Sequence, residues 1–230
     1  MEKSVAVLIK TIQQYREIVV GLLMMLLLSI ILPFLTGFFD VNMTDAGKWC
    51  SAIGLQAVLL SVITLAVIYL EEERKLGAIG LKLPTYNRVK QAVLHGGLLF
   101  MVMYGLSIVL TFLVHDMEVQ AVIRPIMQID GLWQKVLVLV IGAVLVPFSE
   151  ELLFRGYIYG GLNSRMSSKK AMVATAILFA ILHGDLYRFL LFFIGGLWLN
   201  IIYVRSGSLW SSVIAHGIWN GLMIGLMIFS

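Results

Sequence analysis

The stretch VLVLVIGAVLVPFSEELLFRGYIYGGL, residues 136–162, decides the fold of this chain. It is long enough to cross a bilayer, because about 20 apolar residues span the roughly 30 Å of hydrocarbon. Three charged side chains nevertheless lie inside it: Glu150, Glu151 and Arg155. The stretch therefore predicts a transmembrane helix that carries a functional polar cluster.

Six further apolar runs flank this stretch. They cover residues 18–39, 49–70, 91–114, 171–184, 188–204 and 209–229. In lipid only helices and closed barrels satisfy the backbone hydrogen bonds, and these runs are too long for barrel strands. We therefore expect an all-α, polytopic membrane bundle that forms a single domain over residues 1–230. It would have about seven transmembrane helices, or eight helices if the N-terminus adds an interfacial one.

The composition agrees with a membrane protein and excludes an ordinary soluble globular domain. Of the 230 residues, 60% are hydrophobic and 13% are charged, and the mean hydropathy is +0.96. Soluble domains usually contain about 45–50% apolar and about 25% charged residues. The net charge of +4 is spread over short loops, which gives no footprint for nucleic acid. Cys50 is the one cysteine, so an internal disulfide framework and a Cys-based zinc knuckle are excluded.

The distribution of Lys and Arg predicts the orientation of the helices. These residues concentrate at the N-terminus and after the second, fourth and sixth apolar runs. The alternate connections hold fewer, Arg188 among them. Because positively charged connections stay in the cytosol, we expect a cytosolic N-terminus and an external C-terminus. The compact chain with short loops is typical of a protein of a prokaryotic cell membrane.

The three charges in the stretch 136–162 differ in their local partners. An ionised side chain at mid-bilayer costs on the order of 2.5–3.5 kcal/mol, so each needs a partner, water or a function. Glu151 and Arg155 are four residues apart, which predicts an ion pair on one face of the helix. Glu150 has no basic residue within reach on its own helix, and it is our candidate general base. A purely structural ion cluster remains the alternative, chiefly for Glu151 and Arg155.

A proline lies one turn before the two glutamates. Pro147 has no backbone N–H and collides with the Ala143 carbonyl in a regular helix. It predicts a kink just before Glu150, either as a simple bend or as a feature that shapes the site.

Later apolar runs carry two histidines and an asparagine. In helices, Phe179 and His183 share a face, and so do His216 and Asn220. Counted from the basic residues at the cytosolic ends, Glu150, His183 and His216 lie roughly 16–22 Å deep at 1.5 Å per residue. A polar site inside the bilayer requires such a common layer, although either histidine could instead bind a neighbouring helix.

The polar residues form three motifs in a fixed order. Residues 150–155 read EExxxR, residues 179–183 read FxxxH and residues 216–220 read HxxxN. Together they resemble the CAAX protease and bacteriocin-processing family of intramembrane endopeptidases, also called the Abi family, whose eukaryotic relatives trim prenylated CAAX proteins. The resemblance covers about residues 130–230, which would be the catalytic core.

The resemblance implies a role for each motif residue. Glu150 would be the general base and would polarise a water together with His183. His216 and Asn220 would donate hydrogen bonds to the oxyanion of the tetrahedral intermediate, and their spacing aims both donors from one helix face. The supporting residues would be Glu151, Arg155 and Phe179.

The resemblance leaves the need for a metal open. Members of the family are described as metalloproteases, and Glu150, His183 and His216 could supply zinc ligation of the His₂Glu type. The sequence contains no HExxH motif, and a water activated by glutamate and histidine explains the same residues without a metal. We expect no obligatory cofactor, with a divalent metal such as zinc as the alternative.

The substrate follows only from the resemblance. It implies a prenylated CAAX protein, another membrane-anchored protein, or a bacteriocin or signalling peptide, with membrane lipids around the chain and no nucleic acid. A non-catalytic bacteriocin-immunity or regulatory membrane protein is the main alternative, because binding roles leave no motif of their own. A proton-coupled transporter is less favoured, since the sequence shows no internal repeat.

Overall fold

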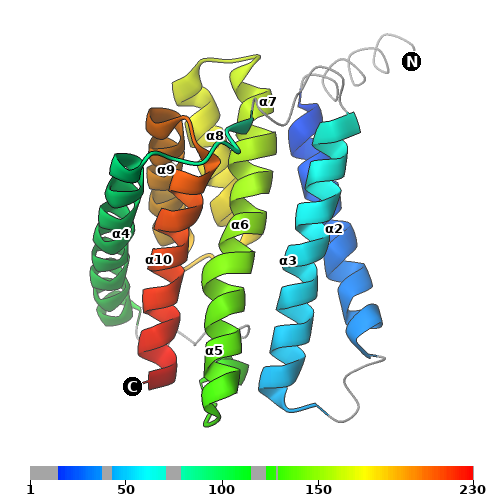
Figure 1. Ribbon diagram of the computed structural model, residues 1–230, viewed down its shortest axis with the longest axis vertical. Helices are drawn as coiled ribbons and strands as arrows, with labels where there is room; N and C mark the ends of the chain where they lie inside the picture. Colours follow the sequence, from blue (N-terminus) through cyan, green and yellow to red (C-terminus); the bar gives the residue numbers. More distant parts are fainter. Residues whose placement is uncertain (1–14, 38–42, 71–78, 115–122, 128, 230) are drawn as a thin grey trace.

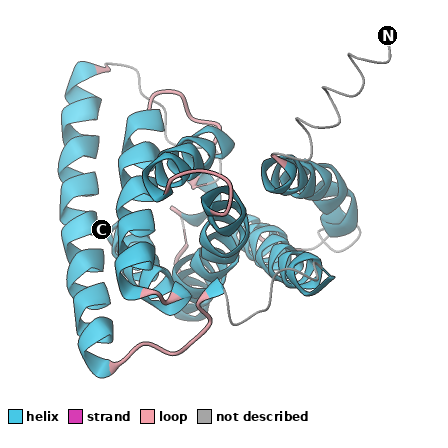
Figure 2. Ribbon diagram, turned by 90° about the horizontal axis from the view of Figure 1, so that it is seen from above, coloured by secondary structure: helices cyan, strands magenta, loops and turns pink. Residues whose placement is uncertain are grey.

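The computed structural model describes residues 15–37, 43–70, 79–114, 123–127 and 129–229. Over these ranges the chain consists of helices and connecting loops, and no strand is present in them (Figures 1 and 2). The expected all-α membrane bundle is therefore confirmed. A cytosolic N-terminus and an external C-terminus remain predictions.

The helices follow the apolar runs of the sequence. Six segments are long and apolar enough to span a membrane: α2 (Arg16–Gly37), α3 (Asp45–Leu70), α4 (Tyr86–Leu113), the composite segment Leu132–Asn163, α9 (Phe189–Ser206) and α10 (Leu209–Phe229). A seventh helix, α8 (Ser168–Leu182), has 15 residues and is shorter than a full span. The start of α2 and the end of α10 lie at opposite ends of the bundle (Figure 1).

The composite segment Leu132–Asn163 is an irregular helix. It consists of α5 (Leu132–Val140), the π-helical η4 (Ile141–Leu145), α6 (Val146–Glu151), the π-helical η5 (Leu152–Tyr159) and α7 (Gly160–Asn163). A short 3₁₀ turn, η3 (Arg124–Ile126), precedes it. π turns are rare and often occur at functional sites. Because one lies on either side of Glu150, this part of the helix is a candidate functional site.

The composite segment and α10 lie at the centre of the bundle. α2 and α4 lie at opposite edges, with the composite segment and α10 between them (Figure 1). α3 packs against α2, α6 and η5, while α4 packs against α10 and α9, and α8 packs against α9. The two elements that carry Glu150 and His216 are therefore each enclosed by further helices.

The outer surface of the bundle is apolar. Phe34 and Phe112, on α2 and α4, expose 69% and 77% of their surface. Large apolar side chains cover much of the exterior in the same way, which a soluble protein avoids and lipid tails accommodate. The exterior therefore supports an integral membrane protein.

A glycine permits the close approach of α4 to α10. A Cβ at Gly96 would lie 2.8 Å from both the Ala215 carbonyl oxygen and the Ile218 Cβ. The next residue, Gly97, has nothing within 4 Å of its Cβ position. Small residues let membrane helices pack backbone against backbone, so Gly96 fixes the contact and Gly97 does not.

We predict that Gly96→Ala destabilises the protein by about 1–3 kcal/mol, because the added methyl group overpacks this contact. Thermal unfolding of detergent-purified protein measures the effect. Gly97→Ala is the matched control, and its melting temperature should equal or exceed that of the wild type. Equal melting temperatures for the two variants would contradict the tight contact.

Candidate active site

Pro147 interrupts the hydrogen bonding of the composite helix next to the candidate base. The Val146 N–H donates to the Ile141 carbonyl five residues earlier, which is the π pattern. The next bond of this pattern would run from residue 147 to the Gly142 carbonyl, but proline has no N–H to donate. The Asn220 amide nitrogen on α10 donates to that carbonyl instead, at 3.2 Å. The expected irregularity before Glu150 is thus a π turn that anchors Asn220.

A buried ion pair lies directly after the candidate base. Glu151 and Arg155 are both fully buried, and the Arg155 Nη1 donates to Glu151 Oε1 at 2.8 Å. This pair is the one that the spacing of four residues predicts. Because uncompensated charges in an apolar interior are strongly destabilising, the pair requires further hydrogen bonds.

α9 supplies those hydrogen bonds to Arg155. The Arg155 Nε donates to Asn200 Oδ1 at 3.2 Å, and its Nη2 donates to the Gly196 carbonyl at 2.8 Å. Asn200 in turn donates from Nδ2 to the Met172 carbonyl on α8 at 2.8 Å. The guanidinium carbon of Arg155 also lies 5.1 Å from the centre of the Phe179 ring. Arg155 therefore ties the composite helix to α8 and α9.

His216 on α10 bridges the two glutamates. Its Nδ1 lies 2.8 Å from Glu151 Oε1, and its Nε2 lies 3.8 Å from Glu150 Oε2. Because the Glu151 carboxylate is paired with Arg155 and accepts hydrogen bonds only, the His216 Nδ1 carries the proton of the short contact. The 3.8 Å separation is beyond hydrogen-bond distance, so the His216 Nε2 and Glu150 face each other without bonding directly.

His183 lies at the C-terminal end of α8. Gly184 follows it with φ +65°, the left-handed conformation in which helices commonly end. The His183 Nδ1 lies 2.7 Å from the Phe179 carbonyl, which can only accept, so this nitrogen is the donor. The ring stacks on Phe192 with centroids 4.0 Å apart. Both histidines are therefore oriented through Nδ1, which leaves each Nε2 for another partner.

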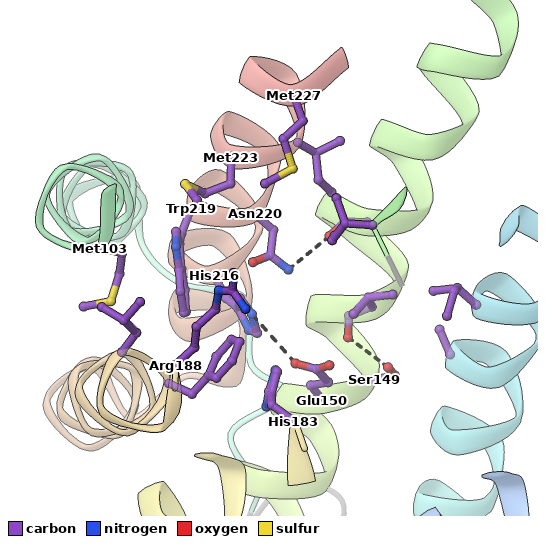
Figure 3. A pocket seen from close by; sticks show the side chains of 18 of the residues that line it. Met103, Ser149, Glu150, His183, Arg188, His216, Trp219, Asn220, Met223 and Met227 are labelled. Carbon is purple, nitrogen blue, oxygen red and sulfur yellow. Dashed lines mark hydrogen bonds and ion pairs between the residues drawn. The ribbon is translucent and has the colours of Figure 1, made fainter. Parts of the chain in front are cut away.

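One cavity brings the predicted residues together. Glu150, His183, His216 and Asn220 all line a cavity of about 340 Å³ (Figure 3). The Glu150 side chain is 21% exposed there, whereas Glu151 behind it is fully buried. Most of the remaining wall is apolar or aromatic, from residues such as Trp49, Phe192, Trp219 and Met223. A carboxylate and two imidazoles thus face an otherwise apolar space.

Two polar residues of this region were not predicted from the sequence. Asn200 is fully buried in the hydrogen bonds of Arg155, yet a single asparagine in an apolar run has no local signal. Arg188 lies in the connection between α8 and α9 to which the sequence assigned it, and in addition it lines the cavity and pairs with Asp185 at 2.5 Å. The short length of α8 lets this loop contribute to the cavity wall, because the loop begins at a shorter distance along the bundle than it would after a full span.

The spacing of the candidate donor residues also decides whether they can hold a metal. Over the described ranges, no three His, Cys, Asp or Glu side chains converge closely enough to hold one ion. The arrangement of Glu150, His183 and His216 in this structure therefore does not fit His₂Glu ligation, and we derive no step through a metal.

Comparison with known proteins supports the resemblance seen in the motifs. Residues 132–222, which include all three motifs, match the family model "Type II CAAX prenyl endopeptidase Rce1-like". The chain is 27% identical over 88 residues to the Bacillus subtilis (strain 168) protein named "Putative membrane peptidase YdiL". The aligned residues make up 38% of this chain and 36% of that protein. The chain is 34% identical over 74 residues to "UPF0177 protein YxdF" of Lactococcus lactis subsp. lactis (strain IL1403). This alignment includes 32% of this chain and 40% of that protein. No solved structure matches the chain.

These findings confirm the recognition of a CAAX endopeptidase-like segment in the C-terminal part of the chain. The matched segments span well under half the length of the two relatives. The roles of the individual site residues remain predictions.

We predict that Arg155→Met lowers the free energy of unfolding by about 3–5 kcal/mol, because it leaves Glu151 as a buried charge without its cationic partner. Unfolding in mixed detergent micelles, followed by circular dichroism, measures the change. The double variant Glu151→Gln/Arg155→Met removes both charges and should recover a large part of the loss. If it is as unstable as the single variant, the loss arises from packing and the argument from charge is wrong.

Proposed function

We propose that this chain is an intramembrane endopeptidase that hydrolyses a peptide bond with a water activated by Glu150 and His183. The observation that carries the proposal is the shared cavity, in which Glu150, His183, His216 and Asn220 meet from three separate helical segments. The family match of residues 132–222 supports the same reaction class.

Glu150 would remove a proton from the attacking water. Its carboxylate is partly exposed to the cavity and is not consumed by the Arg155 pair, which belongs to Glu151. The His183 Nδ1 donates to the Phe179 carbonyl, so the neutral ring presents Nε2 as an acceptor for the second hydrogen of that water. Two acceptors would then orient the oxygen lone pair toward the scissile carbonyl carbon.

His216 and Asn220 would stabilise the negative charge on the carbonyl oxygen. In the imidazolium form both ring nitrogens carry a hydrogen, so the His216 Nδ1–H would donate to Glu151 while Nε2–H donates to the oxyanion. One Asn220 amide hydrogen is used by the Gly142 carbonyl, and the second remains for the oxyanion. Because both groups are held by the protein before the substrate arrives, little reorganisation is needed in the transition state.

The proton that Glu150 takes from water would then be transferred to the leaving amine. When the tetrahedral intermediate collapses, the C–N bond breaks and the leaving amine takes the proton from the Glu150 carboxyl group. The products are a new carboxylate terminus and an amine, and Glu150 returns to its ionised form. No redox partner is required.

The cavity walls favour a substrate with apolar residues. Aromatic and methionine side chains line most of the space next to the polar groups. A prenylated CAAX peptide, another membrane-anchored protein or a hydrophobic signalling peptide would each bury apolar surface against them. A non-catalytic immunity or regulatory role would use the same cavity for binding alone.

We predict that Glu150→Gln reduces the cleavage rate by about 10²–10⁴-fold, because glutamine cannot accept the proton of water. The assay is the cleavage of a fluorogenic farnesylated CAAX peptide, alongside a library of unmodified peptides, by detergent-purified protein. Ser149→Ala is the matched control, since Ser149 lines the same cavity but donates its hydroxyl to the Val146 carbonyl of its own helix.

The wild type, Ser149→Ala and Glu150→Gln should unfold at similar temperatures, so that a rate difference reflects chemistry. Retention of wild-type cleavage by folded Glu150→Gln would exclude this residue as the base. Loss of cleavage in both Glu150→Gln and His183→Ala, with Ser149→Ala active, would favour catalysis over a binding role.

We also predict that cleavage survives incubation with a chelator followed by its removal, because every step above uses only side chains of this chain. The same peptide assay, with metal content measured before and after, checks this. Loss of activity in chelator that zinc restores would overturn the metal-free mechanism while leaving the peptidase assignment intact.

A further inference from the structure

A second cavity lies outside the candidate active site, between α4, α9 and α10. It has a volume of about 420 Å³, and its polar lining includes Arg88 and His95 from α4, Arg205 from α9 and Ser211 from α10. Arg88 lies in the first turn of α4 and Arg205 in the last turn of α9. Both helix ends are at the same end of the bundle as the start of α8, which carries Lys169 and Lys170 (Figure 1).

The lining of this cavity is suited to an anion. None of its lining residues among those described is acidic, whereas two are arginines with exposed side chains. The Arg88 Nη1 also donates to the Ser206 carbonyl, which holds the guanidinium at the cavity, and its Nε–H and Nη2–H groups are further donors. Guanidinium groups bind phosphate oxygens in a geometry that a lysine does not match.

His95 adds a further donor to the lining. The indole nitrogen of Trp198 donates to the His95 Nδ1 at 3.3 Å, and an indole nitrogen can only donate. The Nδ1 is therefore the acceptor, and the neutral His95 ring carries its hydrogen on Nε2. The imidazole thereby offers an N–H and not a lone pair to a further partner.

Ser211 is a buried polar group whose hydroxyl is unsatisfied. Only 1% of the residue is exposed, and within the described part of the chain its Oγ has no hydrogen-bond partner. Leaving a buried hydroxyl unpaired is unfavourable, so such groups call for an explanation in a native structure. An anionic ligand in the cavity that Ser211 lines would accept this hydrogen bond.

The surroundings of the cavity indicate what carries the anion. Leu94 belongs to the lining and is 62% exposed, and Met101 and Val109 continue an exposed apolar face along α4. A lipid with its headgroup between Arg88 and Arg205 could lay its acyl chains along this face. Basic pockets between transmembrane helices are a known way to bind acidic lipid headgroups.

We propose that the cavity lined by Arg88, Arg205, His95 and Ser211 binds the phosphate of an anionic phospholipid. The headgroup would connect α4, α9 and α10 at the end of the bundle where the basic residues gather. The proposal does not depend on the peptidase reaction, because none of these four residues lines the candidate active site.

The test is a titration of detergent-purified full-length protein with dioleoylphosphatidylglycerol, dioleoylphosphatidylcholine or sodium phosphate, read out as the shift in melting temperature and by native mass spectrometry. The wild type should bind phosphatidylglycerol in preference to phosphatidylcholine, whose choline the two arginines repel. Arg88→Gln/Arg205→Gln should bind phosphatidylglycerol at least about tenfold more weakly, because charge-assisted hydrogen bonds are lost. Lys90→Gln, an exposed charge change on the same helix outside the cavity, should bind as the wild type does.

Ser211→Ala separates a specific site from general attraction to the basic surface. It leaves the charge unchanged and should weaken phosphatidylglycerol binding several-fold, while the melting temperature without lipid stays equal or rises. Equal binding of the two lipids, or equal binding of phosphatidylglycerol by the wild type and the double arginine variant, would overturn the proposal. Saturation by sodium phosphate at the same concentration would overturn the lipid as the source of the anion.

Discussion

The buried carboxylate of Glu151 is the constraint on which the site depends. Its Oε1 accepts from both Arg155 and His216, so the composite helix and α10 meet at a single atom. In an apolar interior such a charge is stable only when its partners are held at hydrogen-bond distance. The rotation of α10 about its own axis is fixed as a result, and the neighbouring Glu150 is left facing the cavity.

The irregular backbone of the composite helix is the second feature that positions the site. The π turn before Pro147 leaves the Gly142 carbonyl without a backbone donor, and Asn220 satisfies it. α10 approaches closely enough for this because residue 217 is glycine, where a Cβ would collide with the Ala143 carbonyl. The unpaired carbonyl of the composite helix thus fixes the position of the Asn220 side chain on α10. Lipid could not supply a replacement donor for this carbonyl.

α10 also separates two cavities of different chemistry. His216 faces the cavity that contains the Glu150 carboxylate, whereas Ser211, five residues earlier, lines the cavity with Arg88 and Arg205. The first combines a carboxylate, two imidazoles and apolar walls, which are the groups that the proposed peptidase reaction would use. The second presents donors and cations, as anion binding requires. One helix of 21 residues contributes to both because its faces point to different neighbours.

The sequence alone determined the helical membrane fold and the local part of the site. Apolar runs report burial in lipid directly, so the segments were predicted to within a few residues, and the Glu151–Arg155 pair followed from a spacing of four on one helix. Only the tertiary structure decided that Asn200 completes the Arg155 hydrogen bonds, that Arg188 lines the cavity, and that the His216 Nδ1 binds Glu151. These depend on how separate helices are rotated and how far α8 extends. Helical periodicity fixes which residues share a face, but the partner of that face is set by packing between helices that are distant in the chain.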